Sequence, residues 1–137
     1  MREPFVWQLR VYWEDTDAGG VVYHARYLNF FERARTEWLR SLGVDQAALA
    51  QEQGLLFMIR RIEVDFHRPA RLDDELSVSV HSLEAGGSRL HLRQEILNRR
   101  DGTPLAEAAV TAATLDARSL KPARIPDWIR AEIEHAE

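Results

Sequence analysis

Two acids, two glycines and a histidine gather in a short segment near the start of the chain. Asp15 and Asp17 are two residues apart, and Gly19 and Gly20 follow them. His24 stands just before a predicted helix. Paired glycines let a chain fold tightly and bring backbone N–H groups close to a ligand. A carboxylate beside such groups can act as a nucleophile or a general base, so the segment predicts chemistry on a carbonyl carbon.

The backbone donors for this chemistry would come from the helix that follows. Apolar residues at spacings of three and four predict a helix over about residues 25–42. The first turn of a helix leaves N–H groups without partners, and the helix dipole adds partial positive charge there. An oxyanion or a polarised carbonyl oxygen is stabilised at that position. The apolar stripe consists of Tyr27, Phe30, Phe31, Ala34, Trp38 and Leu42.

Each of these polar residues also has a purely structural interpretation. Aspartates are common in turns and at helix starts, and a single histidine before a helix is often a capping or packed side chain. An Asp-x-Asp pair near a histidine can also bind a metal ion. The segment lacks the histidine-rich spacing of a zinc or iron site, so we expect neither a metal nor another cofactor.

The composition excludes several classes of function. A chain of 137 residues fits one domain, which we expect to span residues 1–137. A net charge of -4 argues against general nucleic-acid binding, which depends on neutralising phosphates. No apolar run reaches the roughly 20 residues of a membrane span, and the first residues turn acidic too early for a signal peptide. The chain has no cysteine, which agrees with a cytoplasmic location.

The elements around the acidic segment are predicted from periodicity and turn signals. A strand over about residues 7–13 (WQLRVYW) leads into it, and a short helix over 45–53 follows the first helix. From Leu55 the apolar period changes to two, which predicts four strands, the last of them alanine-rich over 105–115. Ile125-Pro126 begins a short terminal helix. One amphipathic helix facing a largely antiparallel sheet is an α+β layout. Pro69 is expected to close the first of these four strands, and turns are expected at Gly86-Gly87 and Asp101-Gly102.

The segment VYWEDTDAGGVVYHARYLNFFERARTEWLRSLG closely resembles the N-terminal signature of hotdog-fold acyl-CoA thioesterases. It is most similar to the 4-hydroxybenzoyl-CoA thioesterase family and to its YbgC-like branch, which is associated with the bacterial Tol-Pal envelope system. The similarity continues through VDFHRPARLDDEL and thins after about Gly86. The resemblance implies the hotdog fold, in which a five-stranded antiparallel sheet wraps around one long central helix.

The resemblance also implies which residues carry the reaction. The catalytic aspartate of the family, the second acid of its D-x-D-x-x-G segment, corresponds to Asp17. Asp15, Gly19 and Gly20 would then support the loop. The side chain at the position of His24 is implied to assist by orienting water or substrate.

Three backbone amides are implied to face the thioester carbonyl, namely those of Tyr23, His24 and Ala25. One position departs from the pattern of the branch, which often has tyrosine where this chain has Trp13. A phenol hydroxyl is therefore absent at that position. Tyr12 is predicted to point to the opposite face of the strand, which makes it a poor replacement.

Coenzyme A carries phosphates, so cations are expected at the mouth of the site. The candidates are Arg89, Arg93, Lys121 and Arg124, and each of them is also typical of a solvated surface. In hotdog dimers the site lies between subunits, so a homodimer or homotetramer is expected. The interface would lie near Glu52, Gly54 and residues 57–60.

These observations lead to one main hypothesis and two alternatives. The main hypothesis is hydrolysis of an acyl-CoA, with Asp17 either attacking the carbonyl to form an anhydride or activating water. The carrier of the acyl group would be coenzyme A or an acyl carrier protein. The alternatives are a hotdog dehydratase or isomerase, and a module that binds acyl-CoA or acyl carrier protein without turnover. Release of free thiol distinguishes all three.

Overall fold

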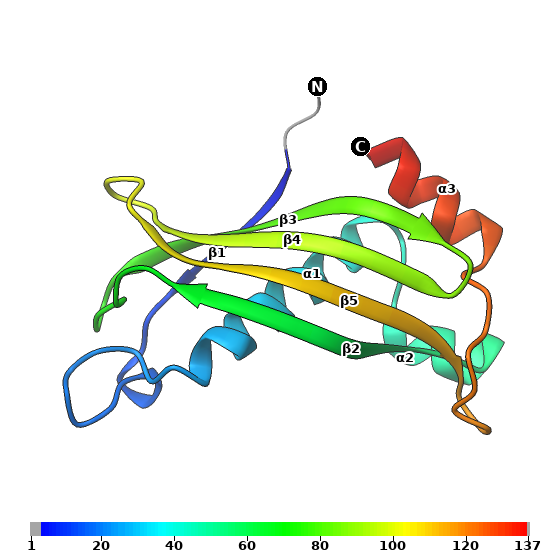
Figure 1. Ribbon diagram of the computed structural model, residues 1–137, viewed down its shortest axis with the longest axis horizontal. Helices are drawn as coiled ribbons and strands as arrows, with labels where there is room; N and C mark the ends of the chain where they lie inside the picture. Colours follow the sequence, from blue (N-terminus) through cyan, green and yellow to red (C-terminus); the bar gives the residue numbers. More distant parts are fainter. Residues whose placement is uncertain (1–3, 137) are drawn as a thin grey trace.

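Five antiparallel strands form one sheet in the computed structural model, which describes residues 4–136. The strand order across the sheet is β1-β3-β4-β5-β2, which places β2 at one edge and β1 at the other (Figure 1). The strands are β1 (Phe5–Arg10), β2 (Leu55–Phe66), β3 (Glu75–Gly86), β4 (Arg89–Asn98) and β5 (Pro104–Asp116). The α-helices are α1 (Arg26–Ser41), α2 (Gln46–Ala48) and α3 (Asp127–Ala136), and two short segments are a 3-10 helix, η1 (Trp13–Asp15), and a π-helix, η2 (Leu49–Gln53).

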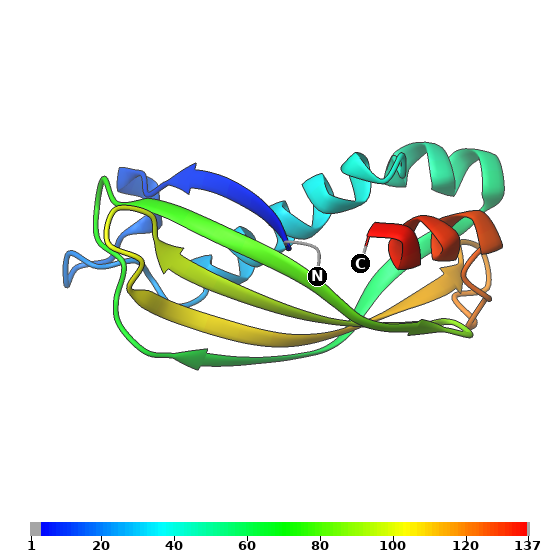
Figure 2. The same cartoon turned by 90° about the horizontal axis from the view of Figure 1, so that it is seen from above.

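Helix α1 lies along one face of the sheet and packs against β1 and β3 (Figure 2). It begins and ends within one residue of the helix predicted over 25–42. Five members of the predicted apolar stripe are buried and Leu42 is half-buried, because one wide apolar face can be covered only by the sheet. The buried members are Tyr27, Phe30, Phe31, Ala34 and Trp38.

The alternating pattern is confirmed most clearly in β3 and β4. Every second residue is buried from Leu76 to Val80 in β3 and from Leu90 to Ile96 in β4, whereas no residue of β2 is fully buried. Alanines of β5 pair with larger residues of β4, as Ala106 does with Ile96. The β-sheet with its helices is therefore the predicted α+β layout. The buried residues of β3 and β4 include Leu76, Val78, Val80, Leu90, Leu92 and Ile96.

The first strand ends earlier than its sequence predicts. It stops at Arg10 instead of Trp13, and Val11 makes the last backbone hydrogen bonds of this pairing, with Asp73 and Asp74 just before β3. The chain then turns into η1, so Tyr12 and Trp13 lie outside the strand and are both exposed. The prediction that Tyr12 points to the opposite strand face is therefore wrong.

The short helices follow the expected signals. The Asp45 carboxylate accepts a hydrogen bond from the Ala48 N–H at 3.0 Å, and the helical stretch ends at Gly54, which has a φ of 63°. Helix α3 packs against β3 and buries Ile129 and Ile133. Across residues 4–136, none of the helices has the length and apolar character that crossing a membrane requires.

Candidate active site

Residues 16–22 fold into a tight hairpin that carries Asp17 near its start. The Asp17 N–H donates to the Val21 carbonyl at 2.9 Å, and the Gly20 N–H donates to the Asp17 carbonyl at 3.0 Å. Gly20 has a φ of 77°, a conformation that favours glycine. The Val22 N–H donates to the Ala70 carbonyl at 2.9 Å, which fixes the hairpin to the segment before β3.

The Asp17 carboxylate is exposed, and its own loop holds one of its oxygens. Its Oδ1 accepts a hydrogen bond from the Gly19 N–H at 2.8 Å. Within residues 4–136 the second oxygen has no hydrogen-bond partner. One oxygen is thus positioned while the other is available to a substrate or a water molecule.

The position of the Asp17 carboxylate leaves little room for a side chain at residue 19. A Cβ atom added at Gly19 would lie 3.2 Å from Asp17 Oδ1, which is closer than ordinary van der Waals contact. We expect Gly19→Ala to displace the carboxylate and lower kcat about tenfold for a reaction that depends on Asp17, since small misplacements are costly. Steady-state kinetics test this expectation.

The matched control for that variant is Gly86→Ala. An added Cβ there meets nothing within 4 Å, and Gly86 has no positive φ. Equal kcat values for the two variants would contradict a positioning role for Gly19.

Asp15 is the buried acid of the pair and ties the loop to the helix start. Its Oδ2 accepts a hydrogen bond from the Tyr12 N–H at 2.8 Å, and its Oδ1 lies 3.9 Å from a guanidinium nitrogen of Arg26. Its backbone carbonyl accepts the Tyr23 N–H at 2.9 Å. These three contacts join Asp15 to Tyr12, Tyr23 and Arg26 on both sides of the Asp17 loop.

Removing this carboxylate should cost stability. We expect Asp15→Ala to lower the free energy of unfolding by about 2–3 kcal/mol, because the Tyr12 N–H and Arg26 lose a buried charged acceptor. Urea unfolding monitored by tryptophan fluorescence measures the difference. The exposed Asp17 offers the comparison, since Asp17→Ala should stay within about 0.5 kcal/mol of the parent. A similar cost for both variants would argue against the supporting role.

Two free donors lie at the start of α1. Of the three predicted amides, that of Tyr23 already donates to the Asp15 carbonyl. The N–H groups of His24 and Ala25 have no acceptor among the described residues, whereas the Arg26 N–H donates to the Tyr23 carbonyl at 2.8 Å. Adjacent free N–H groups at a helix start can hold an oxyanion. The structure therefore leaves His24 and Ala25 as the available pair.

The His24 side chain is exposed and contacts a neighbouring ring. Its centroid lies 4.5 Å from that of Tyr23, with the two planes tilted by 52°. It makes no hydrogen bond to Asp17 within the described part of the chain. The imidazole nitrogens are therefore available to a bound substrate or water.

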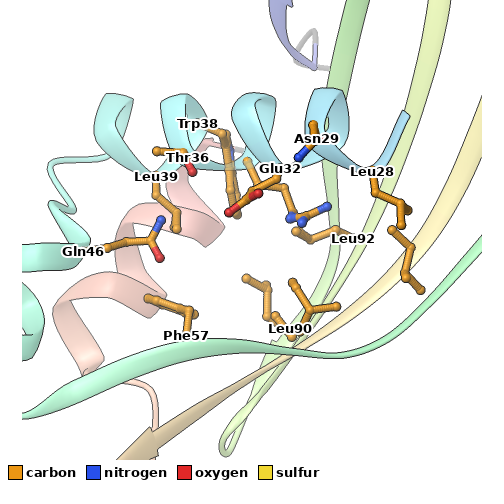
Figure 3. Close-up of a pocket in the computed structure, with 14 residues that line it drawn as sticks. Leu28, Asn29, Glu32, Thr36, Trp38, Leu39, Gln46, Phe57, Leu90 and Leu92 are labelled. Atoms are coloured by element: carbon orange, nitrogen blue, oxygen red, sulfur yellow. The ribbon is translucent and has the colours of Figure 1, made fainter. Parts of the chain in front are cut away.

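A cavity of about 360 Å³ lies between α1 and the sheet (Figure 3). It begins at Leu28 and Asn29, one helical turn beyond the free donors, and extends to Leu39. Figure 3 shows Phe57 and Leu90 pointing into this space from the sheet. Neither Asp17 nor His24 lines it. An apolar space beside a pair of backbone donors can accept the hydrocarbon part of a ligand.

Two charged residues of the cavity were not predicted as site residues. Glu32 and Arg35 both line it from α1. In the sequence they flank the apolar stripe, which is typical of an ordinary solvated helix face. They differ from other surface charges because the helix and the sheet leave a cavity at this point, and both side chains line it.

The structure does not bring the four candidate phosphate-binding cations to the Asp17 loop within one chain. Arg89 and Arg93 alternate with Leu90 and Leu92, so they lie on the sheet face opposite the cavity, where Arg93 pairs with Glu107 at 3.3 Å. Lys121 and Arg124 belong to the segment between β5 and α3, which lies at the end of the molecule opposite the loop between β1 and α1 in both views (Figures 1 and 2). Arg124 lies 3.6 Å from Asp127.

A five-stranded antiparallel sheet, a helix along it and an acidic glycine loop at the helix start together define a protein of the hotdog thioesterase class. Residues 11–133 match the thioesterase-like superfamily, and the chain belongs to this family. This assignment and the similarities below confirm the resemblance found in the sequence.

Individual relatives match over nearly the full chain. The acyl-CoA thioesterase YbgC of Haemophilus influenzae is 44% identical over 131 residues, covering 96% of this chain and 95% of that protein. The structure of a probable thioesterase from Bartonella henselae has a TM-score of 0.85 and 40% identity, covering 90% of this chain and 100% of that chain. That of a 1,4-dihydroxy-2-naphthoyl-CoA thioesterase from Synechocystis has a TM-score of 0.89 and 25% identity, covering 96% of each chain.

Proposed function

We propose that this protein is an acyl-CoA thioesterase, which adds water to the thioester bond and releases a free acid and coenzyme A. The observation that carries the proposal is the near-full-length similarity to the acyl-CoA thioesterase YbgC of Haemophilus influenzae. The geometry supports it, because an available carboxylate and two free backbone donors lie on one loop and the helix start that follows it.

In the proposed reaction the thioester oxygen accepts hydrogen bonds from the N–H groups of His24 and Ala25. Attack on the carbonyl carbon places negative charge on that oxygen, so these donors stabilise the transition state more than the ground state. Asp17 supplies the nucleophile by one of two routes. Its free oxygen attacks the carbon to form an anhydride that water then cleaves, or it takes a proton from an attacking water.

The carbon–sulfur bond breaks as coenzyme A leaves as a thiolate. A thiolate is a good leaving group, so the site needs no strong general acid. The His24 imidazole is proposed to orient the water or the substrate beside Asp17. Trp13 provides no hydroxyl group and is 79% exposed, so we assign it no chemical role.

Thiol release from a panel of acyl-CoA esters tests this function. The panel contains short and long aliphatic esters and aromatic esters, and one matched ester of acyl carrier protein. We expect catalytic release of coenzyme A from at least one member. Tight binding of every ester without thiol release would instead indicate a binding module. Consumption of an ester without free thiol would indicate a dehydratase or isomerase.

We further propose a homo-oligomer built from dimers, in which the sheet of each chain wraps around α1 as the one central helix. Strand β2 pairs with β5 on one side and lies at the edge of the sheet, with Met58 and Ile59 exposed. Long unpaired edges favour pairing with a second strand. In such an assembly a partner would supply the phosphate-binding cations. Sedimentation equilibrium should give at least twice the 15.8 kDa mass of one chain, and a monomer would contradict the proposal.

A further inference from the structure

A fixed guanidinium group stands in the wall of the cavity beneath α1. The Arg35 Nη1 donates to Gln94 Oε1 at 2.9 Å, and Gln94 Nε2 donates to the Phe31 carbonyl at 3.1 Å. Gln94 is completely buried, so its amide has one orientation that satisfies both contacts. The Gln94 side chain, on β4, therefore fixes the position of the Arg35 guanidinium.

Most of the hydrogen-bonding capacity of Arg35 is unused. A guanidinium carries five N–H donors, and in the described chain only the one bond to Gln94 is made. Glu32 is exposed and does not pair with Arg35 within 4 Å. Burial lowers the pKa of Arg35 and the Glu32 carboxylate opposes this, but arginine stays charged in proteins. The cavity thus contains a partly desolvated cation with unused donors as well as the Glu32 carboxylate, and those donors can bind an anionic ligand group.

The distance from Ala25 to Arg35 along α1 can be compared with the length of an acyl chain. It follows Ala25 by ten residues on the same helix, which corresponds to about 15 Å along the axis. Its side chain leans toward the helix start, which shortens that distance. Between the two ends the sheet side of the cavity is apolar, with Ile62 and Leu92 among its residues, and the helix side carries Leu28, Asn29 and Glu32. A chain whose carbonyl lies at Ala25 would run along this wall toward the guanidinium.

We propose that the preferred substrate carries a carboxylate at the far end of its acyl chain and that Arg35 binds this carboxylate. The planar fork of arginine matches a carboxylate with two parallel hydrogen bonds. A methyl end would leave the guanidinium donors without a partner inside the cavity. This inference rests on the proposed acyl-CoA thioesterase function and names the substrate class of that same site.

Binding to the intact protein tests the inference without turnover. The probes are thioether analogues of coenzyme A that cannot be hydrolysed, in pairs of equal chain length: adipoyl against hexanoyl, suberoyl against octanoyl, and sebacoyl against decanoyl. Titration calorimetry measures each Kd. At the length that reaches Arg35 we expect the carboxylate-ended analogue to bind about 30-fold more tightly than its methyl-ended partner. Equal or weaker binding of every carboxylate-ended analogue would overturn the inference.

Variants identify Arg35 as the cause of any preference. Arg35→Met keeps the apolar stem and should remove the preference, while binding of the methyl-ended analogue changes less than about threefold. Arg35→Lys keeps the positive charge but lacks the planar fork, so it should keep only part of the preference for the carboxylate-ended analogue. The control is Arg33→Met, since Arg33 is an exposed residue of the same helix, over the Phe30 ring. A preference that persists in folded Arg35→Met would also overturn the inference.

Thiol release separates failure of this inference from failure of the proposed function. If the enzyme hydrolyses methyl-ended and carboxylate-ended acyl-CoA esters equally well, the thioesterase proposal stands and the role of Arg35 is wrong. If no ester is hydrolysed, the thioesterase proposal is wrong, and the calorimetric comparison still decides whether Arg35 selects a carboxylate.

Discussion

Asp17→Asn should lower kcat for acyl-CoA hydrolysis about a hundredfold or more. Asparagine keeps the size of the side chain and an oxygen that can accept the Gly19 hydrogen bond, so the loop should keep its shape. It lacks the negative charge that either attacks the carbonyl or accepts a proton from water. The loss therefore falls on the chemical step, and KM should change little. Thiol release under saturating acyl-CoA measures kcat.

The control for Asp17→Asn is a second change of aspartate to asparagine, at a residue far from the Asp17 loop. Asp127 is exposed at the start of α3, at the end of the molecule away from the Asp17 loop (Figure 1), so Asp127→Asn should retain the parental kcat. Matching circular dichroism and oligomeric mass would show that Asp17→Asn is folded and assembled. Activity within about threefold of the parent would remove Asp17 from the proposed chemistry.

Most of the fold could be predicted because its local patterns agree with its tertiary packing. The spacing of Tyr27, Phe30, Phe31 and Trp38 predicted α1, since a stripe of that width must be buried. The alternation of apolar and polar residues predicted β2, β3 and β4, and its apolar residues are fully buried in the first half of β3 and in β4. The end of β1 could not be predicted, because it depends on where its pairing with the distant segment at Asp73 and Asp74 stops and the chain turns into η1.

The candidate site could be predicted less completely. The acidic loop and the helix start were recognisable from residue types and spacing. The engagement of the Tyr23 amide by the Asp15 carbonyl is a consequence of backbone geometry that no residue type reveals. The cavity depends on how far α1 lies from the sheet, so Arg35 and Gln94 could not be recognised as a pair. The cations Arg89 and Arg93 were predicted from their charge and their place on a late strand, and strand alternation places them on the other face.

Ala25→Pro should lower kcat about a hundredfold, because it removes one backbone donor from the proposed oxyanion site. Ala25 has a φ of -68° and a ψ of -22°, so its backbone already has the φ that proline requires. The Ala25 N–H donates to no acceptor among the described residues, so the substitution breaks no hydrogen bond of the described chain. Proline is also well tolerated at the start of a helix. Steady-state thiol release on the same acyl-CoA ester measures the loss.

Ala25→Gly is the matched control, since it also changes the side chain but keeps the N–H group. It should retain most of the parental kcat, at a small cost in stability. The oxyanion forms only as the carbonyl is attacked, so the proline variant should lose kcat with little change in KM. A folded Ala25→Pro variant with the kcat of the glycine control would leave His24 as the single free donor. A loss of kcat specific to proline, beside the loss in Asp17→Asn, would show that the Ala25 N–H and the Asp17 carboxylate both stabilise the transition state of the same reaction.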